Sequence, residues 1–354
     1  MKKFALFFLF ISFAYVYLHI YVANFFSKAG FSKNYSIKVF LLLALVSVLT
    51  LFLRRRFNGE GFEAFYLICF VWMGYILILA FFALIGNLAA YLDIEFKKIF
   101  ISSVSLSVIS LVFSLYGALK LPDIKFMDYS SSSVKRNYKL AFISDIHLDF
   151  GFKNKIFLKI IDRISIEKPD LLIIAGDLLD PGFKMDDYVY RIKNAGFPVI
   201  FVFGNHEYYY GLDKSQKIAK ELGLIVLKDS SFVLDGINFI GISDIKTEDI
   251  SLEEAKKTVS KEYKKDLLNI ILSHQPLYFE ELSNEFDFFM LSGHTHCGQI
   301  FPFHIFAKAI YPNFCGGYEN KNSLLYVSKG AGTWGPPLRF LSNSEILVLN
   351  IKKR

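Results

Sequence analysis

The stretch Leu-Leu-Ile-Ile-Ala-Gly-Asp-Leu-Leu-Asp, residues 171–180, decides the fold of the second half of this chain. Its five leading apolar residues are typical of a buried strand, because the run is short and ends in a glycine. Two carboxylates, Asp177 and Asp180, follow directly. In α/β sheets, ligands bind where the strands end at their carboxyl termini. We therefore expect a functional site at the end of this strand.

Four more short apolar segments have the same design, and they are predicted strands at residues 139–144, 198–203, 269–273 and 286–291. Their polar ends read Ser-Asp-Ile-His (144–147), Gly-Asn-His-Glu (204–207), Ser-His-Gln-Pro (273–276) and Gly-His-Thr-His (293–296). Helical patterns are found between and after the strands, at residues 154–167, 187–195, 212–222 and 252–263. This alternation predicts an α/β domain whose central sheets are covered by helices.

The polar strand ends hold the side chains of a two-metal site. Imidazole, carboxylate and amide oxygen suit first-row divalent ions. The candidate ligands are Asp145, His147, Asp177, Asn205, His274, His294 and His296. Two ions about 3.5–4 Å apart need a shared ligand, and the carboxylate of Asp177 can reach both. Glycines precede Asp177, Asn205 and His294, and they allow the backbone to turn sharply next to the ions.

In this order the motifs DxH, GDxxD, GNH[DE], H and GHxH resemble those of the calcineurin-like metallophosphoesterase superfamily, over about residues 138–350. The resemblance implies a four-layer αββα sandwich with two divalent ions, manganese foremost and zinc, iron, nickel or cobalt as alternatives. It implies one ion at Asp145, His147, Asp177 and His296, and the other at Asp177, Asn205, His274 and His294. It also implies that His206 acts on the phosphoryl oxygen or the leaving group, while Asp180 orients this machinery from behind.

The expected activity is hydrolysis of a phosphoester or pyrophosphate bond by metal-activated hydroxide, since two cations lower the pKa of a bound water. Residues 293–299 and 330–335 are similar to a bacterial branch of membrane-associated phosphoesterases, although Cys297 stands where that branch suggests glycine. Some members of that branch act on phospholipid-like or UDP-diacylglucosamine-like substrates. The alternatives are a non-catalytic scaffold and a receptor or transporter. Retention of the whole ligand set argues against a scaffold.

The first 120 residues are predicted to form a bundle of about four transmembrane helices. The apolar stretches are residues 4–27, 39–53, 64–92 and 99–119. A membrane span needs about 20 residues. The second stretch has only 15 uncharged residues, so it spans only if Lys38 and Arg54 extend toward the headgroups. No charged residue lies inside these stretches, which favours an anchor over a transporter.

A linker is expected at residues 121–137, because this segment contains Pro122 and the serine run 130–133. The phosphoesterase domain then occupies residues 138–354. If the N-terminus is cytoplasmic, the segments on the cytoplasmic side of the four helices hold nine Lys and Arg residues. The loops on the opposite side then hold five. The positive-inside rule therefore predicts a multi-pass protein of the cytoplasmic membrane with a cytoplasmic catalytic domain. If the second stretch does not span, that domain lies on the other side.

Three further expectations concern partners, cysteines and the substrate. The part after residue 120 holds 29 Lys and Arg and 29 Asp and Glu, so we expect no nucleic-acid partner. Cys69, Cys297 and Cys315 have no CxxC spacing and are expected to be free thiols.

The aromatic-rich segment 301–318 directly follows two candidate ligands, His294 and His296. Its aromatics either pack against the sandwich or form an apolar rim for membrane lipids and a lipid-linked phosphoester substrate.

Overall fold

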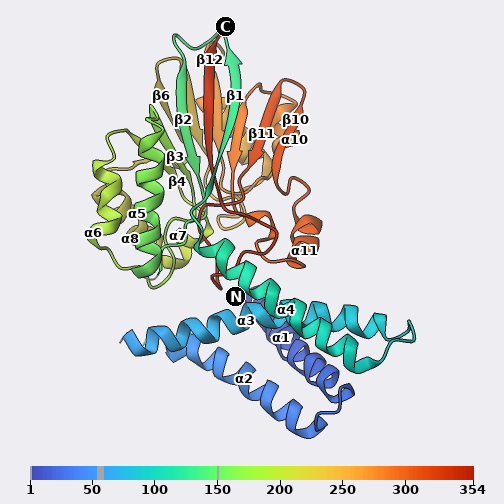
Figure 1. The fold of residues 1–354 in the computed structure, drawn as a ribbon. Coiled ribbons are helices and arrows are strands. Elements are labelled where there is room, and N and C mark those ends of the chain that lie inside the picture. Colours follow the sequence, from blue (N-terminus) through green and yellow to red (C-terminus); the bar gives the residue numbers. More distant parts are fainter. Residues whose placement is uncertain (1, 54–59, 150) are drawn as a thin grey trace. The chain divides into compact units, whose positions relative to one another are not determined.

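The computed structural model describes residues 2–53, 60–149 and 151–354, with the side chains of the first helix described from Ile11 onward. The chain divides into two compact units (Figure 1). One unit consists of Met1–Leu119 together with the short segments Ile300–Pro302 and Gly335–Leu341. The other contains the rest of the chain. Each unit is described by itself below.

The first unit is built on four helices: α1 (Lys2–Lys28), α2 (Lys33–Leu53), α3 (Glu60–Ala89) and α4 (Phe96–Leu119). Within the residues that the structure describes, three helices are long and apolar enough to cross a membrane. They are Lys33–Leu53, Gly61–Ala89 and Phe96–Leu119. The doubtful second stretch therefore reaches spanning length, because the helix begins at Lys33 rather than at Val39. Arg54, Arg55 and Arg56, which entered the charge count, lie outside the described residues.

Several buried polar side chains of the helical unit form hydrogen bonds. His19 is fully buried; its Nδ1 lies 2.9 Å from the carbonyl oxygen of Tyr15, and its Nε2 accepts a hydrogen bond of 3.0 Å from Trp72 Nε1. The segment Gly335–Leu341 packs on α4, where the Arg339 N–H donates to the Ser114 carbonyl at 2.9 Å. A side chain at Gly117 would come within 2.7 Å of the Arg339 carbonyl oxygen, so glycine is required for this approach.

The second unit contains two six-stranded sheets. In spatial order the first has β1 (Asp123–Ser131), β12 (Glu345–Lys353), β2 (Tyr138–Ile143), β3 (Leu171–Ala175), β4 (Val199–Val202) and β5 (Ile225–Val226). The second has β10 (Gly316–Asn320), β11 (Ser323–Val327), β9 (Phe289–Ser292), β8 (Leu268–Leu272), β7 (Ile237–Gly241) and β6 (Ser230–Leu234). Strands β2 to β5 are parallel, as are β7, β8, β9 and β11.

Helices separate and cover these strands. They are α5 (Gly151–Ile166), α6 (Asp187–Tyr190), α7 (Asn205–Tyr210), α8 (Leu212–Glu221), α9 (Leu252–Glu262), α10 (Phe279–Ser283) and α11 (Phe303–Ile310). Two short 3-10 helices are η1 (Arg191–Asn194) and η2 (His296–Gly298). Helix α9 begins with a capping box, in which Ser251 and Glu254 each bond the other's backbone N–H.

The alternation of side chains along each strand defines four layers. On β3, Leu172 and Ile174 pack in one cluster with residues of α5 and α8. Their neighbours Leu171 and Ile173 point the other way, into a cluster that contains Phe239 of the second sheet. That sheet's outer face packs in a third cluster with α9 and α10. The order helix, sheet, sheet, helix confirms the predicted αββα sandwich (Figure 1).

The predicted linker at 121–137 is wrong for most of its length. Residues Asp123–Ser131 form β1, which pairs in parallel with β12 from Asp123 opposite Glu345 to Ser131 opposite Lys353. The partner strand lies more than 200 residues later in the chain. Local composition could not show this pairing, because an edge strand with one solvated face has a polar sequence much like that of a linker.

The expectation of three free thiols is also wrong. Cys297 and Cys315 form a disulfide with their Cα atoms 5.3 Å apart, while Cys69 is a buried free thiol. The 17 residues between the two cysteines include α11, and the chain then returns to its starting point. Spacing along the sequence does not reveal such a return, so the pairing was not predictable from the cysteine pattern.

Candidate metal centre

The carboxyl ends of five parallel strands bring the predicted ligands together. Asp145 and His147 follow β2, Asp177 follows β3, Asn205 follows β4, His274 follows β8, and His294 and His296 follow β9. All are buried except His294, which is half-buried. Five of them have left-handed backbone, with φ between 49° and 69°: Asp145, His147, Asp177, His294 and His296. Such conformations are strained in non-glycine residues, and their concentration here marks a functional site.

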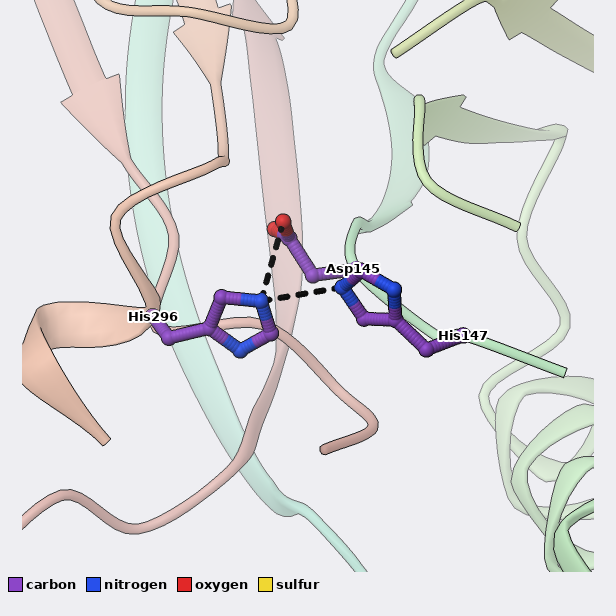
Figure 2. Close-up of side chains that lie close together, drawn as sticks. All are labelled: Asp145, His147 and His296. Atoms are coloured by element: carbon purple, nitrogen blue, oxygen red, sulfur yellow. Dashed lines mark hydrogen bonds and ion pairs between the residues drawn. The ribbon is translucent and has the colours of Figure 1, made fainter. Parts of the chain in front are cut away.

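One group of candidate ligands consists of Asp145, His147 and His296, shown in Figure 2. The Nε2 atoms of His147 and His296 are 3.0 Å apart, and His296 Nε2 is 3.4 Å from Asp145 Oδ1. Ligand atoms of all three residues lie within 4.8 Å of one another. The three side chains therefore converge on one point, where they could hold a cation.

A second group consists of Asp177, His274 and His294. His274 Nε2 lies 3.2 Å from both Asp177 Oδ2 and His294 Nδ1. The Nδ1 atom of His274 bonds the Ala175 carbonyl at 2.8 Å, which leaves Nε2 to face the group. Asn205 Oδ1 is buried and has no hydrogen-bond partner in the part of the chain that the structure describes. A buried amide oxygen without a partner is costly, so it fits a cation ligand.

The Asp177 carboxylate connects the two groups. Its Oδ2 atom is 3.2 Å from His274 Nε2 and 3.7 Å from His147 Nε2, so one oxygen faces an imidazole of each group. Its Oδ1 atom accepts the His206 N–H at 3.0 Å. A carboxylate in this position can bridge two ions, as the sequence predicts.

Asp180 and His206 lie beside the ligands. The Asp180 carboxylate accepts from His147 Nδ1 at 2.9 Å and forms a short ion pair with His206 Nδ1. His206, His147 and Asp177 also form a third group whose atoms could by distance hold a cation. The ring of His206 makes edge contacts with two aromatic rings. The distance between ring centroids is 5.2 Å to Tyr209 and 6.2 Å to Trp334. Both aromatics are about half exposed, and sequence reasoning gave them no role in the site.

The charges in this buried cluster balance one another. Burial raises the pKa of Asp145. Burial also acts to raise the pKa of Asp177, but the nearby His274 and His206 lower it well below its usual range. Despite burial, Asp177 and Asp180 raise the pKa of His206 to about 9. The carboxylates therefore favour a proton on the His206 ring, and a bound divalent ion nearby would supply positive charge in its place.

Glu207 has a larger part in the site than its position after His206 suggested. Its fully buried carboxylate accepts backbone N–H groups of Asp177, Leu178, Leu179 and Gly204 at 2.7–2.9 Å. Burial and the charge of Asp177 raise its pKa to about 8, against the pull of the backbone donors. The side chain thus joins the turn after β3 to the turn after β4 and fixes Asp177 relative to Asn205.

Comparisons with known proteins agree with this geometry. Residues 138–298 match the family model described as calcineurin-like phosphoesterase. An uncharacterised metallophosphoesterase of Campylobacter jejuni is 33% identical over 76% of this chain and 74% of its own length. One from Helicobacter pylori is 31% identical over 67% of this chain and 65% of its own length. A zebrafish (Danio rerio) transmembrane protein with metallophosphoesterase domain is 28% identical over 70% of this chain and 62% of its own length.

Gly204 provides a test of the geometry of the site. Its backbone, with φ of −98°, suits any residue, but a Cβ there would collide with the carboxylate and backbone nitrogen of Asp177. We expect Gly204→Ala to displace Asp177, empty both groups of metal and reduce hydrolysis about 100-fold. Metal content by mass spectrometry is the measurement. Gly317→Ala, where a Cβ meets nothing within 4 Å, is the matched control. Two tightly held ions in the Gly204→Ala variant would contradict the role of Asp177.

Proposed function

The chain belongs to the calcineurin-like phosphoesterase family, and on this premise we propose that it hydrolyses phosphoester or pyrophosphate bonds at a centre of two divalent ions. The observation that supports this best is the Asp177 carboxylate, which faces His274 of one ligand group and His147 of the other. A single imidazole–carboxylate cluster would need no such shared oxygen. The family uses a dinuclear divalent centre, and these side chains supply the ligands for one.

The proposed ligands follow the two groups. One ion would be held by Asp145, His147, Asp177 and His296, and the other by Asp177, Asn205, His274 and His294. The set contains four imidazoles, three oxygen-donor side chains and no thiolate; the oxygen donors suit Mn²⁺, and the imidazoles suit iron, nickel and zinc. We therefore propose manganese as the foremost metal, with iron, cobalt, nickel and zinc as alternatives.

Bound divalent ions would activate a water molecule and neutralise charge on the phosphoryl oxygens. The side chains of this chain do the remaining work. Asp180 holds the Nδ1 side of His206, so that Nε2 can donate to the phosphoryl or leaving oxygen. Glu207 keeps the turns that carry Asp177 and Asn205 in a fixed relation. Asp180 also bonds the ring of His147 and so orients a proposed ligand.

We further propose that the substrate is a lipid-linked phosphodiester or pyrophosphate. It would resemble a phospholipid or UDP-diacylglucosamine. Helix α11 begins seven residues after His296 and exposes apolar side chains over 45–62% of their surface: Phe303, Ile305, Phe306 and Ile310. Among the aromatics of segment 301–318, Tyr311 and Phe314 do pack inward. An exposed apolar helix in a membrane-anchored protein favours contact with acyl chains.

Two observations bear on the membrane side of the phosphoesterase unit. The count of Lys and Arg favours the cytoplasm by nine to five, and three of the nine are Arg54, Arg55 and Arg56. The Cys297–Cys315 disulfide favours an oxidising compartment, because cytosolic thiol systems keep such pairs reduced. A formed disulfide is a stronger constraint than a margin of four charges. We therefore propose that the unit faces away from the cytoplasm, which requires an odd number of spans if the N-terminus is inside, or an N-terminus outside if all four helices span.

The metal centre is tested with two variants of the full chain. Asp177→Asn should lose both ions and lower hydrolysis of p-nitrophenyl phosphate esters by more than about 100-fold, because one change weakens both ligand groups. His206→Ala should keep two ions while turnover falls about 10²- to 10⁴-fold. Metal content and steady-state rates with added Mn²⁺ decide the outcome. Full activity in Asp177→Asn would refute the centre, and a metal-depleted His206→Ala would make His206 a ligand.

The lipid-linked substrate is tested at the apolar surface of α11. The double variant Phe303→Ser and Phe306→Ser should lower hydrolysis of a long-chain lipid pyrophosphate in mixed micelles about 10-fold or more, since two exposed aromatic contacts are lost. Rates on small water-soluble esters should not change, because neither residue belongs to the metal centre. Ile166→Ser, on an exposed apolar residue of α5, is the control. Equal losses on both substrates would make α11 structural.

The membrane side is tested by thiol labelling and by a reporter. In intact cells whose thiols are quenched during lysis, Cys297 and Cys315 should react with maleimide only after reduction. A periplasmic alkaline phosphatase fused after β12 should be active, and a cytoplasmic-only fluorescent reporter should be dark. Freely reactive cysteines together with a bright fluorescent reporter would restore the cytoplasmic orientation that the charge count favours.

A further inference from the structure

A chain of buried polar side chains continues outward from His294. The Tyr311 hydroxyl lies 2.7 Å from His294 Nε2 and 3.1 Å from Gln275 Oε1. The amide nitrogen of Gln275 then lies 2.8 and 3.0 Å from the two carboxylate oxygens of Asp244. Asp244, Gln275 and Tyr311 are 0, 1 and 8% exposed, so water does not replace these contacts. None of the three belongs to a ligand group, although Gln275 directly follows the proposed ligand His274.

The chemistry of Asp244 fixes the direction of every hydrogen bond in this chain. An ionised carboxylate only accepts, so the Gln275 amide must turn its NH₂ group toward Asp244. Gln275 Oε1 then faces Tyr311, and an amide oxygen also only accepts. The Tyr311 hydroxyl must therefore donate its proton to Gln275. Its oxygen is left to accept, and the N–H that it accepts from His294 has to be on Nε2.

This direction decides the tautomer of His294. With its proton on Nε2, a neutral imidazole has its lone pair on Nδ1. Nδ1 is the atom that lies 3.2 Å from His274 Nε2, inside the group with Asp177. The lone pair thus points to where the second ion is proposed to lie.

Lys246 completes the surroundings of the hydroxyl. Its ammonium donates to the Tyr311 oxygen at 2.8 Å and lies 4.2 Å from the centre of the tyrosine ring. The hydroxyl thus donates once and accepts twice, from His294 and from Lys246, which uses its full capacity. A lysine here cannot accept a proton from the hydroxyl, so it reinforces the direction that Asp244 imposes.

The disulfide-closed loop delivers Tyr311 to this position. The loop runs from Cys297, the residue after His296, through α11 to Cys315. The Thr295 hydroxyl donates to the Phe314 carbonyl at 2.7 Å, and the Tyr318 hydroxyl accepts the N–H groups of Phe314 and Cys315. Tyr311 is therefore held between two fixed points of the loop, next to a strand end that carries two proposed ligands.

We propose that Tyr311 is a positioning residue of the metal centre, which sets the tautomer and ring orientation of His294 through a one-way hydrogen-bond chain that ends at Asp244. The inference rests on the proposed function, since it concerns a ligand of the second ion. Partners that hold the outer nitrogen of a metal-bound histidine change metal affinity about 10- to 100-fold when removed. Tyr311 acts through His294 and does not touch the substrate in this role.

The test uses the full chain in detergent, stripped of metal and titrated with Mn²⁺, with Co²⁺ absorption spectra as a second readout. Tyr311→Phe keeps the ring and removes the acceptor for His294. It should weaken one of two ions about 10- to 100-fold and shift the Co²⁺ bands, while the other ion binds as before. Gln275→Leu removes the acceptor for the Tyr311 proton and should weaken the same ion. The double variant should be no weaker than Tyr311→Phe alone, because both changes break one chain.

Tyr263→Phe is the control, because it removes a tyrosine hydroxyl that bonds the Asp287 carbonyl, outside the loop and the metal centre, and it should bind both ions like the parent. Unchanged Mn²⁺ affinity and an unchanged Co²⁺ spectrum in Tyr311→Phe would overturn the inference. The proposed function would still stand if the parent chain binds two ions. Equal weakening in Tyr263→Phe would also overturn the inference, since the loss would then not be specific to the hydroxyl that contacts His294. A parent chain that binds no ions would overturn both. If Tyr311→Phe does not fold, the affinity of Gln275→Leu decides.

Discussion

The structure depends on the burial of several carboxylates and imidazoles at one point between two sheets. Such groups are strongly disfavoured in a protein interior unless each has a partner of opposite charge or a cation. Here, Asp177 alone faces two imidazoles and one backbone N–H, and the surrounding turns are fixed by the Glu207 carboxylate. The strained left-handed turns at the strand ends persist because this network and the packed sheets behind it hold them.

The sequence predicts the centre of the phosphoesterase unit well. The strand Leu171–Ala175 has the predicted bounds, and the capping box at Ser251 correctly marks the start of α9. These signals are local. The strand is recognised from five consecutive apolar residues, and the capping box from four consecutive residues. The candidate ligand residues can also be selected from the sequence, because each follows the end of an apolar strand. The assignment of individual ions to individual residues stays a prediction.

Other features depend on contacts between distant residues, and the sequence did not show them. The sequence of β1 predicts a linker, because the partner strand β12 lies at the other end of the domain. The Cys297–Cys315 pair was missed because a returning loop brings the two cysteines together. Glu207 and Tyr311 act by bonding atoms that are 28–30 and 17 residues away, respectively. Residue type and spacing along one segment cannot reveal such partners.

The position of β12 has a consequence for how the protein is made. This strand lies between β1 and β2, and it pairs with both. During synthesis, the four helices and then both neighbours of β12 emerge from the ribosome first. The first sheet therefore has a gap until residues 345–353 have been synthesised, and the facing edges of β1 and β2 stay unpaired for that time. Exposed strand edges invite pairing with other chains. The first sheet of the catalytic unit is thus expected to close only after the four helices and the other strands of that sheet have been synthesised.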